Sequence, residues 1–282
     1  MNDVLKGSLL MICAAMLIPL GDAVAKFAHL TFGVPISFMA WSRFALGAVL
    51  LAPFALRRRI GFGELTRWPV LLRGATISAT VWFILKAVST EPIANVYGAF
   101  FIAPILSFGL AVVLLGERPS RVRVLLTCLG FVGVLLVVRP GIGLSTGMGF
   151  ALLSGVFYAL YLTANRWLAG THRGMAMLWA QLIVGGLVMA PFGMSMDGAV
   201  WSAGLALCVL ISASTSAFAN LMIVEGYRLA EATRLAPLVY VQLIAATSYG
   251  VLFFGTFPDA MALFGLGLLI ASGFAALTLK RN

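Results

Sequence analysis

Apolar stretches about as long as a membrane is wide follow one another along the 282 residues of the chain. The hydrocarbon core of a bilayer needs about 20 apolar residues per helix. Because backbone polar groups find no water in lipid, each stretch is predicted to be a helix that pairs its own N–H and C=O groups. The pattern predicts an all-α integral membrane protein with ten spans, at residues 7–28, 34–56, 68–88, 92–115, 121–138, 147–168, 174–193, 199–224, 232–254 and 258–279.

The composition agrees with this class. Hydrophobic residues make up 62% of the chain and charged residues 10%, whereas a soluble domain has roughly 45–50% apolar and 25% charged residues. The net charge of +10 has a simple origin, because cytoplasmic loops of membrane proteins collect Lys and Arg. We therefore expect the lipid bilayer as a partner and no nucleic acid.

The positive residues also predict the orientation. With the N-terminus in the cytoplasm, the inner side collects all Lys and Arg residues except Lys26, Arg43, Lys86 and Arg139. Positive residues favour the cytoplasmic side, so both termini are predicted to be cytoplasmic. Short loops and a basic inner surface favour a multi-pass protein of a bacterial inner (plasma) membrane.

A repeated corner divides the chain into two halves, predicted at 1–141 and 142–282. Gly116 and Pro119 in LLGERPS (114–120) recur as Gly255 and Pro258 in FFGTFPD (253–259), at an offset of 139 residues. Each half holds an odd number of spans, so the halves must be inverted relative to one another in the membrane. Inverted repeats are typical of secondary transporters, in which one repeat moves against the other around a central site.

The motifs GERPS (116–120), GFVGVLLVVRPG (130–141), RF (43–44) and APLVYVQLIAATSYGVLFFGTFP (236–258) resemble the drug/metabolite transporter superfamily. The resemblance is to its EamA-type members with ten helices and covers nearly the whole chain. These motifs, taken together with D-x-x-x-K at 22–26, look closest to those of carriers of S-adenosylmethionine, riboflavin or amino-acid metabolites. One departure is Thr256, which stands where the family often has a carboxylate like that of Glu117.

Charged residues inside spans are costly and are therefore functional candidates. Asp22 and Lys26 lie four residues apart on one helix face and can pair, either to bind a zwitterion or couple a proton, or as a structural ion pair. Arg43 lies near mid-depth, where Asp22 or a substrate carboxylate or phosphate could neutralise it. Glu91 opens the fourth span, as a coupling carboxylate or as a partner of the helix dipole. Arg73 is expected to extend to the inner membrane surface.

Polar and aromatic side chains within the spans predict a substrate cavity. Such cavities combine aromatic walls with a few polar groups that orient the ligand. Single aromatic residues also serve interfacial belts and helix packing. By resemblance to the family's central cavity, the predicted substrate-binding residues are Tyr97, Tyr158, Tyr240, Arg43, Asn95, Phe101, Trp82 and Gln242.

The motifs of several enzyme classes are missing from the sequence. There is no HExxH, GxSxG or P-loop motif, and the three cysteines have no CxxC spacing. We expect no enzyme, no cofactor and no metal site. The favoured function is secondary transport of a small organic metabolite, an amino acid or amino-acid-derived zwitterion, or a vitamin.

Three alternatives remain open at this stage. The first is a proton-coupled multidrug efflux transporter, and the second, of another class, is a lipid flippase or an intramembrane enzyme. The third concerns assembly: Gly130, Gly133, Gly265 and Gly267 fit a homodimer contact of the kind that the resemblance implies, or tight packing within one chain.

Overall fold

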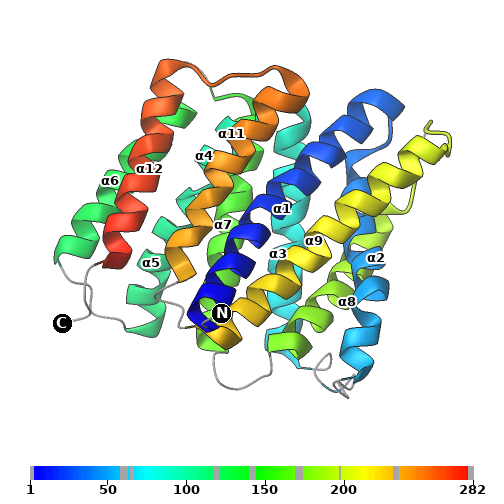
Figure 1. Ribbon diagram of the computed structural model, residues 1–282, viewed down its shortest axis with the longest axis horizontal. Coiled ribbons are helices and arrows are strands. Elements are labelled where there is room, and N and C mark those ends of the chain that lie inside the picture. The colour runs from blue at the N-terminus through cyan, green and yellow to red at the C-terminus, as the bar shows by residue number, and fades with distance from the viewer. Residues whose placement is uncertain are drawn as a thin grey trace.

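The computed structural model describes residues 3–57, 63, 67–116, 121–139, 144–168, 174–196, 198–230 and 235–278. Within these residues the regular structure is entirely helical, as predicted (Figure 1). Glu117 and Pro119 of the first corner lie outside the described residues.

The helices follow the predicted spans closely. The first half holds α1 (Asp3–Phe32), α2 (Ile36–Arg57), α3 (Trp68–Thr90), α4 (Ile93–Phe100), α5 (Ile102–Leu115) and α6 (Arg121–Val138). The second half holds α7 (Thr146–Trp167), α8 (Gly174–Gly193), α9 (Ala203–Leu229), the 3₁₀ helix η3 (Ala236–Tyr240), α11 (Val241–Phe254) and α12 (Ala260–Thr278).

Seven helical stretches of the described chain are long and apolar enough to cross a membrane. Shorter apolar helices lie at 124–138, 238–254 and 260–275, where the fifth, ninth and tenth spans were predicted. The count of ten spans therefore stays a prediction, as does the orientation of the termini.

Two predicted spans are broken rather than continuous. The span predicted at 92–115 ends as α4 at Phe100 and resumes as α5 after Phe101. Pro104 explains the break, because proline has no N–H and its ring clashes with the carbonyl four residues earlier. The span predicted at 232–254 changes from η3 to α11 after Tyr240. Phe101 and Tyr240 are separated by the repeat offset of 139 residues, so both halves break at equivalent positions.

The corner glycines repeat in the same way. Gly116 ends α5 with φ +68°, and Gly255 ends α11 with φ +62°. Both values lie in the left-handed region that glycine adopts without strain, which is the usual way to end a helix. The sequence repeat is therefore also a repeat of backbone conformation.

The two halves pack through pairs of helices that the repeat relates. α1 packs on α9, and its repeat-equivalent α7 packs on α3; the pairs α2 with α8 and α6 with α12 each join equivalent helices (Figure 1). α11 packs on α1, and its equivalent α5 packs on α7. A rotation that exchanges the halves therefore preserves these contacts.

The repeats are inverted. Lys26 near the end of α1 reaches Glu91 beyond the end of α3, so α1 and α3 run in the same direction. α7 runs against them, because Gly147 lies beside Thr90 whereas Ser154 bonds to the carbonyl of Thr80. We call the end that carries residues 33–35, 91–92 and 255–259 the upper end, and the end that carries the N-terminus the lower end, as in Figure 1.

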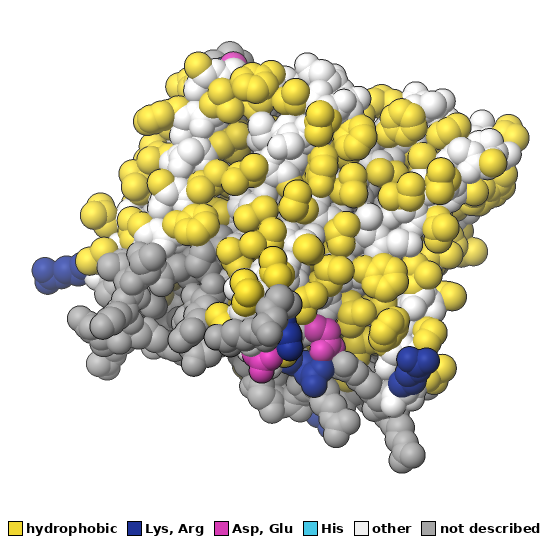
Figure 2. All heavy atoms as spheres, in the orientation of Figure 1, with side chains coloured by type: hydrophobic (Ala, Val, Ile, Leu, Met, Phe, Trp, Pro, Cys, Tyr) yellow, Lys and Arg dark blue, Asp and Glu magenta, His cyan; other side chains and the backbone are white. Residues whose placement is uncertain are grey.

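The surface is that of a membrane protein. Figure 2 shows an apolar face whose basic and acidic side chains gather mainly along the lower edge. Large apolar side chains are well exposed on many helices, among them Val113 (78%), Leu252 (74%) and Phe264 (67%). Soluble monomers rarely expose contiguous apolar patches of more than a few hundred Å². The chain is therefore a multi-pass membrane protein.

Candidate functional site

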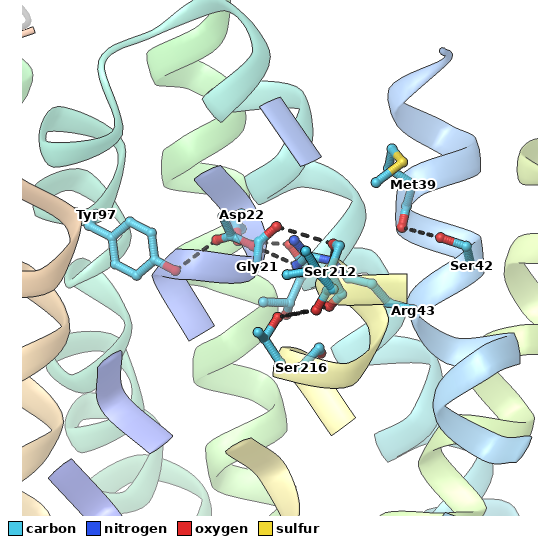
Figure 3. Close-up of polar contacts among 12 residues, drawn as sticks. Gly21, Asp22, Met39, Ser42, Arg43, Tyr97, Ser212 and Ser216 are labelled. Atoms are coloured by element: carbon cyan, nitrogen blue, oxygen red, sulfur yellow. Dashed lines mark hydrogen bonds and ion pairs between the residues drawn. The ribbon is translucent and has the colours of Figure 1, made fainter. Parts of the chain in front are cut away.

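A buried ion pair joins Asp22 of α1 to Arg43 of α2. Asp22 Oδ1 lies 2.5 Å from Arg43 Nη1, and the Tyr97 hydroxyl on α4 donates to Asp22 Oδ2 at 2.7 Å. Figure 3 shows Tyr97 and Arg43 approaching the carboxylate from opposite sides. All three side chains are buried. Asp22 lies ten residues before the end of α1, which is about 15 Å along the helix.

α9 completes this cluster. Arg43 Nε donates to Ser212 Oγ at 2.9 Å, and Ser212 Oγ donates to the Gly21 carbonyl at 3.1 Å. A Cβ at Gly21 would lie only 2.7 Å from Thr215 Oγ1, so glycine allows α1 and α9 to approach here. Arg43 Nη2 is buried and has no hydrogen-bond partner among the described residues. The guanidinium therefore retains a donor that a ligand could use.

Lys26 does not pair with Asp22, which corrects one of the predicted contacts. Its ammonium donates to the Glu91 carbonyl at 2.7 Å and lies 5.1 Å from the centre of the Phe254 ring. The Glu91 carboxylate accepts from Ser145 Oγ at 2.5 Å, at the start of α7. Arg43 takes the place beside Asp22 because it comes from a neighbouring helix at the same depth.

The predicted aromatic residues gather next to the ion pair. The ring of Phe101 lies 5.1 Å from that of Tyr240, and the ring of Phe100 lies 5.0 Å from that of Tyr158 and 6.0 Å from that of Tyr97. Aromatic pairs attract at such distances. The two helix breaks thus meet in one aromatic group with members from α4, η3 and α7.

Two other predicted site residues make further contacts or are buried nearby in the chain. Trp82 stacks on Phe192 of α8 with ring centres 5.2 Å apart, on the α3 side of the bundle. Gln242 is buried in the first turn of α11.

Asn95 and Glu91 line a cavity of about 210 Å³ near the upper end, together with Arg139 and Asp259. Arg139 donates a short hydrogen bond to Asp259 across this cavity. The N–H of Ala262 and then the Arg139 guanidinium hold the pKa of the Asp259 carboxyl below its ordinary value of 3.8.

A second arginine cluster was missed by sequence reasoning. Arg73 does not extend to the membrane surface but is buried, with 6% of its surface exposed. Its guanidinium donates to Asn165 Oδ1, to the Met177 carbonyl at 2.9 Å and to the Tyr161 hydroxyl at 2.8 Å. Tyr161 in turn donates to Gln181 Oε1 at 3.0 Å.

The repeat offset relates some residues of the two arginine clusters. Adding 139 to Asp22 gives Tyr161, and adding it to Arg73 gives Ser212. The Arg73 cluster thus lies in the lower part of the bundle where inversion places the counterpart of the Asp22 cluster. Applying the offset to Asp22, an acid inside a predicted span, would have pointed to Tyr161, one member of the Arg73 cluster.

Comparison with known proteins agrees with these features. The model of the EamA-like transporter family matches twice, at residues 5–139 and 145–278. An S-adenosylmethionine uptake transporter of Rickettsia prowazekii is 25% identical over 96% of this chain and 93% of its own. A pseudopaline exporter of Pseudomonas aeruginosa is 28% identical over 98% and 97%, and a riboflavin transporter of Rhizobium johnstonii is 25% identical over 98% and 91%.

The fold has also been seen before. One solved crystal structure superposes with a TM-score of 0.67 at 18% identity, covering 96% of both chains. The two family matches fall on either side of residues 140–144 and together cover nearly the whole sequence. The chain therefore belongs to the EamA-like transporter family.

Proposed function

We propose that the protein is a secondary transporter that moves an amino acid, or a zwitterionic metabolite derived from one, across the bacterial inner membrane by alternating access. The observation that carries this proposal is the buried Asp22–Arg43–Tyr97 cluster beside the aromatic group at the two helix breaks. Broken helices at a repeat interface are where secondary transporters bind their substrates.

The cluster offers both signs of charge to a ligand. The Asp22 carboxylate can accept from a substrate ammonium, and Arg43 Nη2 can donate to a substrate carboxylate without breaking its bond to Ser212. Tyr97, Phe101 and Tyr240 supply aromatic surfaces that attract cations and flat rings. S-adenosylmethionine combines an amino-acid headgroup, a sulfonium and a purine, and it suits this combination; riboflavin suits the aromatic surfaces alone.

Names of relatives support a metabolite as substrate. They include uptake transporters for S-adenosylmethionine, transporters of riboflavin and exporters of pseudopaline. The repeat offset relates Asp22 to Tyr161 and Arg73 to Ser212. This supports alternating access, because related polar residues at two different depths suit a cycle that exchanges the conformations of the halves. Basic residues Lys6, Arg57, Arg67 and Arg121 lie at or near the lower ends of helices, which supports a cytoplasmic lower end.

Proton-coupled drug efflux fits the site less well. It needs a buried carboxylate that takes up and releases a proton, whereas Asp22 is held by Arg43 at 2.5 Å and by Tyr97 at 2.7 Å.

The test is thermal stabilisation of the purified protein by S-adenosylmethionine, L-methionine, riboflavin and a lipophilic drug cation. A ligand of the folded state raises the melting temperature by mass action. We expect a shift with S-adenosylmethionine that is lost in Arg43→Gln and kept in Arg228→Gln, a control in an exposed ion pair at the lower end. Shifts with drug cations alone, lost in Asp22→Asn, would favour drug efflux instead.

A further inference from the structure

The cavity near the upper end is separate from the Asp22 cluster. Its polar lining comes from Glu91, Asn95, Arg139 and Asp259, at the junctions of α3 with α4, α6 with α7 and α11 with α12. None of these side chains takes part in the bonds of Asp22 or Arg43. A cavity with charged walls in so apolar a chain calls for an explanation of its own.

One of the lining residues, Asn95, carries an unsatisfied acceptor. Asn95 Oδ1 is buried and has no hydrogen-bond partner among the described residues. Leaving a buried polar atom unpaired costs free energy, and such atoms are rare in folded proteins. The carboxylates of Glu91 and Asp259 in the same lining add negative charge. A ligand N–H, above all that of an ammonium group, would satisfy Asn95 and be attracted by both acids.

The same lining also carries a positive charge. Arg139 is held in place by hydrogen bonds to Asp259 and to the Leu136 carbonyl, and its backbone has φ +50°, an uncommon value for a residue other than glycine. A guanidinium beside the acids disfavours a bare metal cation and favours a ligand that bears both charges. Val137, Val138, Met148 and Ala262 form the apolar part of the lining.

The size of the cavity limits the ligand. Its volume of about 210 Å³ is below the roughly 300–1,000 Å³ that is usual for sites of drug-sized molecules. At about 30 Å³ per water molecule, it accommodates an amino-acid headgroup with a short side chain but not a whole nucleoside.

We propose that this cavity is a second binding site for the headgroup of an α-amino acid, with the ammonium on Asn95 and Glu91 and the carboxylate on Arg139. It lies at the upper mouth of the protein, and an amino-acid-derived substrate would occupy it before or after the core site. The inference that the occupant is the transported substrate rests on the proposed function. The inference that the site binds an amino-acid headgroup rests only on its charges and is independent of that function.

The experiment measures equilibrium binding of radiolabelled L-methionine to the purified full-length protein. We expect two sites per chain in the wild type, the core site alone in Asn95→Leu, and the upper site alone in Arg43→Gln. Loss of the Asn95 acceptor should weaken upper-site binding at least about tenfold, the usual effect of removing a hydrogen bond to a charged group. Asn95→Asp keeps an acceptor and adds charge, so it should restore binding and also shows that the position tolerates change.

Two competitors test the assignment of charges. Both are tested in the Arg43→Gln protein, in which only the upper site is expected. L-Methionine methyl ester lacks the carboxylate, so its binding at the upper site should not depend on Arg139. 4-(Methylthio)butanoate lacks the ammonium and should not compete at all. Equal competition by both compounds, or competition by sodium ions alone, would overturn the proposal.

The outcomes separate this proposal from the proposed function. A single site that Arg43→Gln abolishes and Asn95→Leu leaves intact overturns the upper site and leaves the core site standing. A single site with the reverse response supports the upper site and overturns the core site. Absence of L-methionine binding at millimolar concentrations in a folded wild type overturns the upper site as a headgroup site.

Discussion

Phe101 and Tyr240 are repeat-equivalent residues whose rings pack against one another, with centres 5.1 Å apart and planes inclined by 38°. Each stands at the break in its own half. The contact therefore joins equivalent positions of the two halves. A change in the angle between the halves would change this ring contact directly.

We expect Tyr240→Ala to weaken S-adenosylmethionine binding while leaving the fold intact. An aromatic pair adds about 0.5–1.5 kcal/mol of interaction free energy beyond that of its buried area. A ligand that stacks on the Tyr240 ring would lose an interaction of this kind in the variant. Tyr249→Ala is the matched control, since Tyr249 packs on Phe253 of the same helix with ring centres 5.9 Å apart. Titration with thermal shift as readout checks the prediction, and equal effects of both variants would contradict it.

Asp22 and Arg43 should be strongly coupled in stability. Removing one partner of a buried ion pair typically costs about 3–5 kcal/mol, because the other charge is left uncompensated. We expect Asp22→Asn and Arg43→Gln each to lower stability markedly, and the double variant to cost less than the sum of the two. Unfolding of the four proteins in a double-mutant cycle measures this coupling, and additive effects would mean that the charges are not paired.

Gly21 should not tolerate a larger side chain. Its Cβ would lie 2.7 Å from Thr215 Oγ1 and 3.3 Å from the Ser212 carbonyl, so Gly21→Ala should cost about 1–3 kcal/mol through overpacking. Adding Thr215→Ala removes the nearer atom and should recover part of the loss. Melting temperatures of the single and double variants test this, with Gly149→Ala as control, because a Cβ there meets no atom within 4 Å.

We expect the stability of the fold to depend on pH through Asp259. The pKa of its carboxyl is lowered in the folded state by the Ala262 N–H and by Arg139. A lowered pKa stabilises the fold above the ordinary value of 3.8, and this contribution is lost as the pH falls through the folded value. Asp259→Asn should therefore melt below the wild type at neutral pH, and the difference should shrink in strong acid. A difference that does not change with pH would contradict this origin.

The sequence predicted the helical class and the approximate bounds of the helices, because the length of an apolar stretch depends on local composition. The offset between Gly116 and Gly255 likewise predicted the repeat of backbone conformation. The sequence did not predict the break at Tyr240, since a 3₁₀ turn inside an apolar run leaves the hydrophobic pattern unchanged. The break after Phe100 was readable from Pro104.

Site residues were harder to place for a different reason. Asp22 has a lysine four residues away on its own helix, yet it pairs with Arg43 on the next helix. Which residue pairs with Asp22 depends on how α1 and α2 are rotated about their own axes. The sequence of one helix does not contain that information. Arg73 was misplaced on the same ground, because its partners Tyr161 and Asn165 come from α7.

The most direct test of the central claim is uptake of radiolabelled S-adenosylmethionine by proteoliposomes preloaded with the unlabelled compound. Exchange needs no knowledge of the coupling ion or of the direction of transport in the cell. We expect exchange by the wild type, its loss in Arg43→Gln, and normal exchange in Arg228→Gln. Exchange that persists in a folded Arg43→Gln protein would contradict a substrate site at the Asp22–Arg43 pair.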